Sequence, residues 1–526
     1  MPKLLLRTAL FLLILSTSAA VPAYPDSNPT PSAGVLEMTL ADAVSLALRQ
    51  NRSIRIYYLD RVLEKYNLEY AESEFIPNVR LDGSANIQRD TEETFFHKLK
   101  DTDLKRDTWS AGAQTSVSQK IPTGGEFAFV WDNSRDFTRT DDGLLVTNDQ
   151  GFTSSWTASF RQPLLKGGGT TINRASLVRA RLKERENILA LRDNLSNVIA
   201  SAITGYLQFY QSTRNVRIRK TALERAREQF EINKVLVESG RMAPSELVQS
   251  EAQVADQEFA YESALNNLDN ARLNLLDVLE LNLETEIRPV EDINLKMVKP
   301  DLEKTVAVAR ANNTSLLVAE NSVTRAELEL IEEKNSRLWE LDAQASYGRE
   351  FFDSFGSNIN DHDKDFWSIG FSLNAPIEIF GRDYLEEKIP LIQARRDVHV
   401  SKINLKEEEN DLKTRVINGV RNVHSQLRLV QQARKKLELA RQKLEIEKVK
   451  LRLGRTTNFQ VVSFENDLVN AQESELQSTI SYLNALTDLD LLLGTVLDTW
   501  DVEFKTQSSR AQETLGSEGY FYGREP

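Results

Sequence analysis

Two long segments of the chain carry the apolar spacing of coiled-coil helices. Residues 172–239 and 382–453 are highly charged, nearly free of Gly and Pro, and apolar at every seventh position. These positions are Val216, Leu223, Phe230 and Val237 in the first segment and Val430, Leu437, Leu444 and Leu451 in the second. A seven-residue repeat predicts helices packed along one another, and at 1.5 Å per residue each would be on the order of 100 Å long. Shorter helices are predicted at 40–75, 245–280, 302–336 and 458–497.

Between the helices the apolar period changes from about seven to two. The alternating runs place large apolar side chains on one side of each predicted strand; these include Trp156, Phe160, Trp367, Ile369, Phe371 and Leu373. Strands of about ten residues with one aromatic-rich side and one polar side are typical of an outer-membrane barrel, whose apolar side faces lipid. A soluble sheet with one buried face shows the same alternation. Taken alone, the alternation favours the soluble sheet.

The chain is built from one unit that occurs twice. An offset of 262 residues aligns 40–54 with 302–316, and an offset of 214 aligns 223–241 with 437–455. The 48-residue difference places an insertion in the first copy, within 90–155. Two long copies indicate internal pseudo-symmetry within one structure rather than a solenoid of short repeats.

The duplication divides the chain into parts. The expected parts are a first repeat at 40–281 with strands within 77–165, a linker at 282–301, a second repeat at 302–498 with strands within 339–377, and a polar tail at 499–526. Within the insertion, alternating runs at 109–117 and 127–131 flank the turn sequence Pro122-Thr123-Gly124-Gly125. The first repeat therefore has up to four strands and the second has two. Whether the extra hairpin near 109–138 enters the same wall stays open at this point.

The N-terminus has the composition of an export signal. Lys3 and Arg7 precede an apolar run from Ala9 to Leu15, and small residues follow it. This run is too short to span a bilayer, which takes about 20 residues. Residues 1–23 are therefore expected to be a signal peptide that is removed on export. The prolines that follow predict an extended leader over 24–39.

Composition argues against most kinds of chemistry. The chain has no Cys, which rules out disulfides, thiol nucleophiles and lipidation at an N-terminal Cys, and its four His lack the spacing of a metal site. No catalytic constellation is found, so we expect no enzyme, no cofactor and no bound metal. A net charge of −13 without a basic cluster argues against nucleic acid as a partner.

Four to six strands are too few to close a barrel, for which about eight is the minimum. An open edge facing lipid is forbidden, because its backbone groups would lack hydrogen-bond partners. A homotrimer resolves the conflict with twelve strands, or eighteen if the extra hairpin joins, and it also closes the helices into a hollow cylinder. The predicted fold is α+β and mostly helical, with a long antiparallel coiled-coil tunnel and a transmembrane β-barrel completed by trimerisation.

Together these features resemble the TolC-type outer-membrane efflux proteins. The resemblance covers 36–498 and rests on the duplicated order of elements, on Gln162-Pro163-Leu164-Leu165 before Gly167-Gly168-Gly169, and on a Gly-Arg pair at both helix tips. It implies a homotrimeric exit duct in the outer membrane with a helical tunnel in the periplasm. It also implies an inner-membrane pump and a periplasmic adaptor (membrane fusion) protein as partners, in efflux or type I secretion. The alternative is a soluble periplasmic coiled-coil structural or adaptor protein, which leaves the aromatic strands unexplained.

The resemblance further implies which residues act. The turns at the periplasmic tips would dock the adaptor and form the gate; their residues are Gly240, Arg241, Ser245, Glu246, Gly454, Arg455, Asn458, Gln460 and Ser463. Ser245 and Asn458 are expected to cap the helices that follow, and three copies of Glu246 would favour cations. The joints between strands and long helices are expected at Pro163, Gly167, Pro376 and Gly381.

Overall fold

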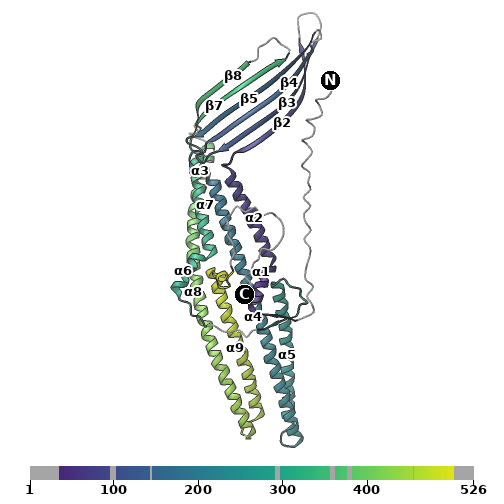
Figure 1. The fold of residues 1–526 in the computed structure, drawn as a ribbon. Helices are drawn as coiled ribbons and strands as arrows, with labels where there is room; N and C mark the ends of the chain where they lie inside the picture. Colours follow the sequence, from purple (N-terminus) through teal and green to yellow (C-terminus); the bar gives the residue numbers. More distant parts are fainter. Residues whose placement is uncertain are drawn as a thin grey trace.

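The molecule is tall and narrow, with a curved sheet at one end and long helices that run from it to the other end (Figure 1). The structure is a computed structural model, and it describes residues 35–94, 102–141, 145–290, 297–355, 362–375, 382–453 and 455–502. The predicted signal peptide and most of the predicted leader and tail lie outside the described residues.

Two helices run nearly the whole length of the helical part, and shorter helices accompany them. The long ones are α4 (Ala175–Glu238), with 64 residues, and α8 (Arg382–Arg452), with 71. Near the sheet they are accompanied by α1 (Leu40–Gln50), α2 (Arg52–Ser73), α6 (Leu302–Asn312) and α7 (Thr314–Ser336). Farther from the sheet the companions are α5 (Pro244–Val278) and α9 (Asn458–Leu493). The two remaining described helices are the short α3 (Thr170–Asn173) and α10 (Val496–Thr499).

The main sheet is an antiparallel meander of six strands in the order β2-β3-β4-β5-β7-β8. Its strands are β2 (Asn78–Thr94), β3 (Thr102–Lys120), β4 (Glu126–Asp141), β5 (Val146–Pro163), β7 (Glu340–Phe355) and β8 (His362–Asn374). The extra hairpin, β3 and β4, is paired to β2 on one side and to β5 on the other. The hairpin is therefore part of the same sheet, which answers the question that the sequence left open.

Two helices predicted to be continuous are each broken in the middle. The predicted helix at 40–75 is α1 followed by α2, and the one at 302–336 is α6 followed by α7. The breaks fall at Asn51 and Asn313, which are 262 residues apart and have extended backbone angles. The Asn51 side chain accepts from the N–H of Ser53 (2.9 Å), and the Asn313 side chain accepts from that of Leu316 (3.1 Å). Because each asparagine caps the helix that follows, the break is stable although the apolar spacing continues across it.

The end of the predicted leader is docked on the folded unit. Residues of β1 (Leu36–Met38) pair in parallel with β6 (Ile287–Pro289), which lies in the predicted linker. The Met38 side chain is buried, and the Tyr206 hydroxyl on α4 donates to the Met38 carbonyl (3.2 Å).

The apolar core is divided into clusters along the helices. The largest lies where α1, α4 and α5 meet and includes the fully buried Tyr206, Leu275 and Leu279. A second cluster in the other repeat contains Val416 and Tyr482. The Tyr482 hydroxyl accepts from the Val298 N–H (2.8 Å) and thereby fixes the chain before α6. Among the described helices, none combines the length and hydrophobicity required to cross a bilayer.

Replacing Asn313 by Ala should lower the free energy of unfolding by about 1 kcal/mol, because the substitution removes the cap of α7. The Asn313 amide also donates to the Leu492 carbonyl (3.0 Å), which would lose its partner. Denaturant unfolding of the purified protein, followed by circular dichroism, measures the change. Asn312→Ala is the control, since the Asn312 amide bonds only to Val308 in its own helix (3.3 Å). Equal loss in both variants would contradict the cap assignment.

Candidate functional site: the faces of the sheet and the helix tips

The register of the sheet sorts its side chains onto two opposite faces. A row on one face crosses all six strands and consists of Val79, Val117, Phe129, Ala158, Tyr347 and Trp367. A row on the opposite face consists of Asp82, Gln114, Asp132, Ser155, Glu350 and Lys364. We call the first side the apolar face and the second the polar face. The apolar face extends into the extra hairpin through Val117, Phe129 and Trp131, and on β4 the polar residues Asn133 and Arg135 follow on the same face.

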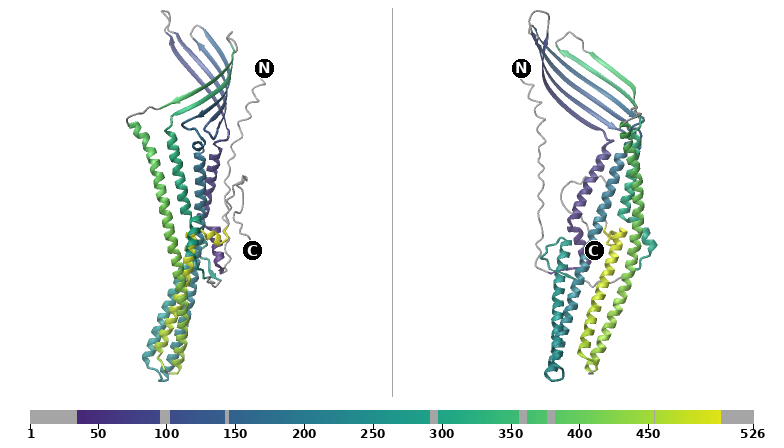
Figure 2. Two further views of the ribbon diagram at one scale, coloured as in Figure 1. Left: turned by 90° about the vertical axis from the view of Figure 1, so that its left-hand side faces the viewer. Right: turned by 180° about the vertical axis from the view of Figure 1, so that it is seen from behind.

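The apolar face is uncovered in the protomer. Trp367, Ile369 and Phe371 are each more than 70% exposed, at 74%, 73% and 73%. All six residues predicted to face lipid lie on this face; the other three are Trp156, Phe160 and Leu373. Aromatic pairs join neighbouring strands here, with ring centroids 5.2 Å apart for Trp109 and Phe137. No helix in the described ranges packs over the face (Figure 2).

The apolar stretch of this face ends at ion pairs. On β2 it runs from Val79 to Ile87, and the next residue on the same face, Arg89, pairs with Asp107 of β3 (Nε to Oδ1, 2.5 Å). On β7 the first charged residue on this face is Arg349, whose guanidinium pairs with the Asp363 carboxylate of β8 (2.7 Å), and Phe351 follows it on the same face. From Val79 to Ile87 on β2 there are eight residue steps, which at about 3.4 Å each give an apolar stretch of about 27 Å along that strand.

The joint between β5 and α4 is held by hydrogen bonds. Gly167 and Gly169 have φ values of 79° and 99°, which other residues rarely adopt. The Asn173 amide donates to the carbonyls of both glycines (2.7 and 2.9 Å), and Gly169 donates to the Thr123 carbonyl in the β3–β4 turn (3.0 Å). A Cβ on Gly124 of that turn would lie 2.4 Å from the Gly167 carbonyl oxygen. The extra hairpin is thus locked to the joint that leads into α4.

The first tip joins α4 to α5 by a tight turn. Gly240 has a left-handed φ of 70°, and the Arg241 N–H donates to the carbonyl five residues before it (2.8 Å), which is the Schellman pattern. The prediction that Ser245 caps α5 is wrong: Pro244 is the first helical residue, and no side chain caps it. Proline suits this position because it lacks an N–H and its φ is already helical. Glu246 lies half-buried in the first turn of α5, where the helix dipole favours a negative charge.

The second tip joins α8 to α9 by an equivalent turn. The Arg455 N–H donates to the carbonyl five residues before it (2.9 Å); Gly454 lies outside the described residues. The predicted cap of α9, Asn458, is wrong by one residue. Thr457 is the cap, and its hydroxyl accepts from the Gln460 N–H (3.4 Å), while Asn458 is buried.

A buried polar residue holds each tip together. The Thr456 hydroxyl donates to the Glu447 carboxylate of α8 (2.5 Å), and the Lys450 ammonium lies 3.1 Å from it. The hydrogen bond from Thr456, followed by Lys450, holds the pKa of Glu447 below its usual value of 4.5. The equivalent residue of the first repeat, 214 positions earlier, is Asn233, whose amide donates to the Ser250 hydroxyl on α5 (2.5 Å).

The two helical hairpins meet each other through polar side chains. In the lower half the helices form one layer in the order α5, α4, α9, α8 (Figure 2). The contacts between α4/α5 and α9 include Gln211 to Gln477 (2.5 Å), Arg219 to Glu473 (2.6 Å) and Gln257 to Asn466 (3.5 Å). In this lower part the contact between the hairpins includes several polar pairs, whereas toward mid-height Ile480 of α9 packs into the apolar cluster of α4 and α5.

The sequence predictions found the positions of the tips but missed the residues that hold them. Glu447 and Asn233 each occupy a core position of a heptad. A polar residue at such a position could have been recognised in the sequence, but the prediction considered only the apolar positions. Ser463 lies half-buried near the start of α9. Of the predicted joints, Pro163 ends β5 and Gly167 follows it, while Pro376 and Gly381 lie outside the described residues.

Comparison with known structures identifies the fold. The chain is similar to the outer-membrane channel OprN, with 14% identity over 86% of this chain and 89% of that one and a TM-score of 0.61. It is similar to VceC of Vibrio cholerae, with 14% identity over 87% and 95% of the two chains and a TM-score of 0.60. CmeC of Campylobacter jejuni gives 16% identity, coverage of 86% and 85%, and a TM-score of 0.57. No protein-family model and no curated sequence matches. The chain therefore has the fold of these outer-membrane channels, which is the TolC-type fold that the sequence resembles.

Replacing Glu447 by Gln should loosen the second tip and remove a pH dependence. The pKa of Glu447 is lowered in the folded state. Its carboxylate therefore stabilises the folded tip at pH values above the ordinary pKa of a carboxyl group, and this stabilisation is lost as the pH falls through the folded-state pKa. Hydrogen exchange of the amides in 447–460, corrected for intrinsic rates, should be faster in the variant at pH 7. The wild type should approach the variant in acid. The control is Glu445→Gln at an exposed site of the same helix, and equal exchange in both variants would contradict the assignment.

Proposed function

We propose that the protein is the outer-membrane exit duct of a tripartite efflux or type I secretion system. The observation that carries this proposal is the apolar face, which is exposed, includes residues of all six strands and carries ion pairs at Arg89 of β2 and Arg349 of β7. Soluble monomers rarely expose apolar patches beyond a few hundred Å². The apolar stretch of β2, about 27 Å long, rises about 21 Å along the barrel axis at a tilt of about 40°, which is comparable to the lipid-facing band of outer-membrane barrels, about 25 Å tall. A soluble sheet would need another layer over this face, and the described residues supply none.

Closure of the sheet requires further copies of the chain. The outer strands β2 and β8 each have one unpaired edge, which lipid does not tolerate. Because β2 runs away from the helices and β8 runs toward them (Figure 1), β8 of one copy can pair antiparallel with β2 of the next. Three copies close eighteen strands, and at about 4.8 Å between strands and about 40° of tilt the barrel is about 36 Å across. The polar face then lines a water-filled lumen.

The helices of this trimer would continue the lumen as a tunnel through the periplasm. The shared fold with the channels OprN and CmeC supports this arrangement. In this arrangement the tips around Gly240, Arg241 and Arg455 meet a periplasmic adaptor, and an inner-membrane pump supplies the energy. The duct itself performs no chemistry, so substrates cross it passively.

Replacing Ile369 by Lys should destabilise the membrane-embedded protein by about 2–4 kcal/mol, the cost of a lysine on the lipid side near the bilayer midplane. Gly370→Lys is the matched control, because Gly370 is on the polar face and has open space around its Cβ position. Unfolding by guanidinium from lipid vesicles measures the difference. Similar stabilities of the two variants would argue for a sheet with water on both sides.

The purified protein should form ion-conducting pores in planar bilayers, with a preference for cations. Glu246→Ala should reduce that preference, since three carboxylates near a narrow axis attract cations. Reversal potentials in a salt gradient measure the preference, with the exposed Glu228→Ala on α4 as control. Absence of conductance in the wild type and in Glu447→Gln, whose tip is loosened, would overturn the proposed duct.

A further inference from the structure

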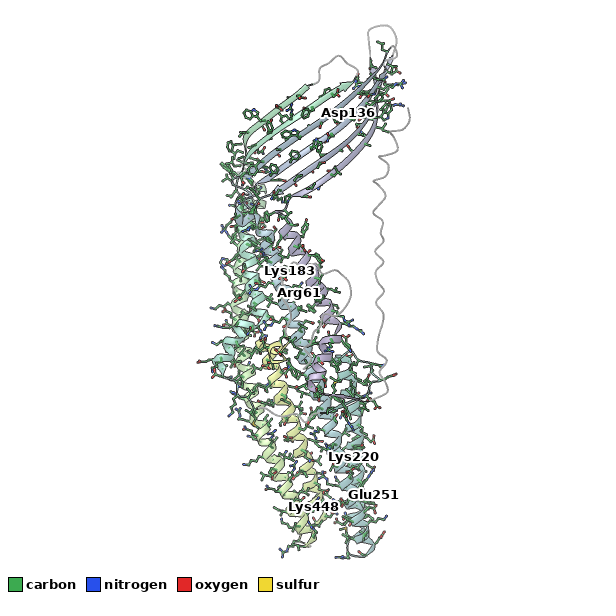
Figure 3. All side chains as sticks on the ribbon, viewed as in Figure 1. Arg61, Asp136, Lys183, Lys220, Glu251 and Lys448 are labelled. Atoms are coloured by element: carbon green, nitrogen blue, oxygen red, sulfur yellow. The ribbon has the colours of Figure 1, made fainter. Side chains whose placement is uncertain are left out.

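The apolar face carries a group of basic side chains toward the end that is farthest from the helices. We call this group the basic patch; its members are Arg89 of β2, Lys105 of β3, and Arg135 and Arg139 of β4. All four residues are exposed. Asp136, which follows Arg135 in β4 and is labelled in Figure 3, shows where the group lies on the sheet. Three of the four basic residues belong to the extra hairpin.

The register places three of these residues around one carboxylate. Arg89 lies opposite Asp107 on one side and Arg139 on the other, and Lys105 is two residues from Asp107 on the same face. Arg89 donates to both carboxylate oxygens of Asp107 (2.5 and 2.9 Å). Lys105 lies opposite Asp141, but neither Lys105 nor Arg139 forms an ion pair with any residue that the structure describes. Basic residues outnumber acidic ones four to two here, so the patch has an excess of positive charge.

Arg135 extends the patch into the apolar part of the face. Its neighbours across the strands are Ala111 of β3 and Phe152 of β5, and Phe137 follows it on the same face of β4. No carboxylate in the described part of the sheet forms an ion pair with Arg135. A cation among apolar neighbours is costly in lipid, and long basic side chains reach toward the headgroups to reduce this cost. An anionic group at the level of Arg139 would supply the missing counter-charge.

The patch lies at the height where the lipid-facing band of the proposed barrel ends. Ten residue steps from Val79 to Arg89, at about 3.4 Å each, give about 34 Å along β2. At a tilt of about 40° this distance rises about 26 Å, and the band of outer-membrane barrels is about 25 Å tall. The register places the acidic pair Glu93 and Asp103 two rows farther out. The basic residues are therefore the ones that meet the headgroups.

The excess of positive charge is confined to the side of the sheet that contains the extra hairpin. On β7 and β8 the same face carries one basic residue, Arg349, which pairs with Asp363 (2.7 Å) and Asp365 (3.5 Å). Asp353 of β7 lies on this face as well. A general attraction of the barrel to anionic lipid would not require this asymmetry, whereas a localised lipid site on the hairpin does.

The side chains next to the patch suit the rest of a lipid molecule. Trp109 and Phe137, with ring centroids 5.2 Å apart, lie one row nearer the helices than Asp107 and Arg139. Tryptophan is enriched where hydrocarbon meets headgroups. A guanidinium group binds a phosphate group through two parallel hydrogen bonds, which gives it a preference for phosphate over other anions. The hairpin thus presents aromatic rings at the level of the acyl chains and guanidinium groups directly above them.

We propose that the basic patch binds the phosphate groups of an anionic lipid in the leaflet that is farther from the helices. This inference rests on the proposed duct, because only a barrel in the outer membrane exposes the apolar face to that leaflet. Arg135 and Arg139 hold the phosphate groups from two sides of Phe137, and Lys105 adds positive charge above them. The extra hairpin therefore contributes a lipid site as well as two strands.

Binding of a phosphorylated lipid tests the site directly. The purified full chain is titrated with diphosphorylated lipid A in zwitterionic mixed micelles, and native mass spectrometry measures the bound lipid. A basic side chain near a membrane surface contributes about fivefold to the affinity for anionic lipid. The double variant Arg135→Gln with Arg139→Gln should therefore bind about 25-fold more weakly than the wild type. Lipid A without its phosphate groups should bind equally weakly to both proteins.

The matched control removes the same charge from the opposite face. Arg80→Gln with Arg106→Gln changes two exposed residues of the polar face on β2 and β3, and it should leave binding unchanged. Equal weakening in the two double variants, or equal affinity for lipid with and without phosphate groups, overturns the proposal. Inorganic phosphate is titrated alone as a separate arm. Binding of inorganic phosphate without binding of the lipid would assign the patch to the free ion and would also overturn it.

A variant with the opposite expected effect guards against loss of binding through misfolding. Asp107→Asn removes the carboxylate at the centre of the patch and frees Arg89, so lipid A should bind about fivefold more tightly. Unchanged or weaker binding overturns the arrangement around Asp107. Conductance in planar bilayers without any preference for the phosphorylated lipid would leave the duct standing and refute the lipid site alone. Preference for that lipid in protein without conductance would uphold the site and count only against the duct.

Discussion

The backbone of a sheet edge must find hydrogen-bond partners, and in lipid no water supplies them. The protomer has a six-stranded sheet with β2 and β8 at its two ends, and its apolar face is exposed. The proposed assembly follows from this constraint, since only further copies can pair both edges. The even number of strands allows the ring to close antiparallel throughout. The insertion preserves this property because it adds a hairpin, which contributes two strands, instead of a single strand.

The extra hairpin is integrated at both of its ends. Its strands share the register of the sheet, so that Val117 and Phe129 continue the row between Val79 and Ala158. Its turn packs on the joint that leads into α4, where Gly169 donates to Thr123 and Gly124 has no room for a Cβ. The hairpin that widens the sheet is therefore also attached to the helical part, at the joint where β5 ends and α4 begins.

The sequence predicted elements with strong periodicity and missed interactions that periodicity does not report. The heptads located α4 and α8, and the alternation located β7 and β8, because each pattern reflects which side of the element is apolar. The breaks at Asn51 and Asn313 were missed since the apolar spacing is the same on both sides. The caps of α5 and α9 were assigned to Ser245 and Asn458, which are suitable residue types, but Pro244 and Thr457 occupy the positions where the helices begin. The pairing of Glu447 with Thr456 depends on the path of the turn, which the spacing of apolar residues does not specify.

The distribution of apolar and polar contacts determines where the helical part can open. At mid-height Tyr206, Leu275 and Leu279 are fully buried, and burial of one large apolar side chain contributes about 1.5–3 kcal/mol. Lower down, the hairpins meet through partly buried ion pairs such as Arg219 and Glu473, whose cost of desolvation offsets much of their attraction. Separation of the hairpins therefore costs less toward the tips than near the sheet. In the proposed duct, this distribution would allow the lower end to open while the apolar clusters at mid-height keep the sheet unchanged.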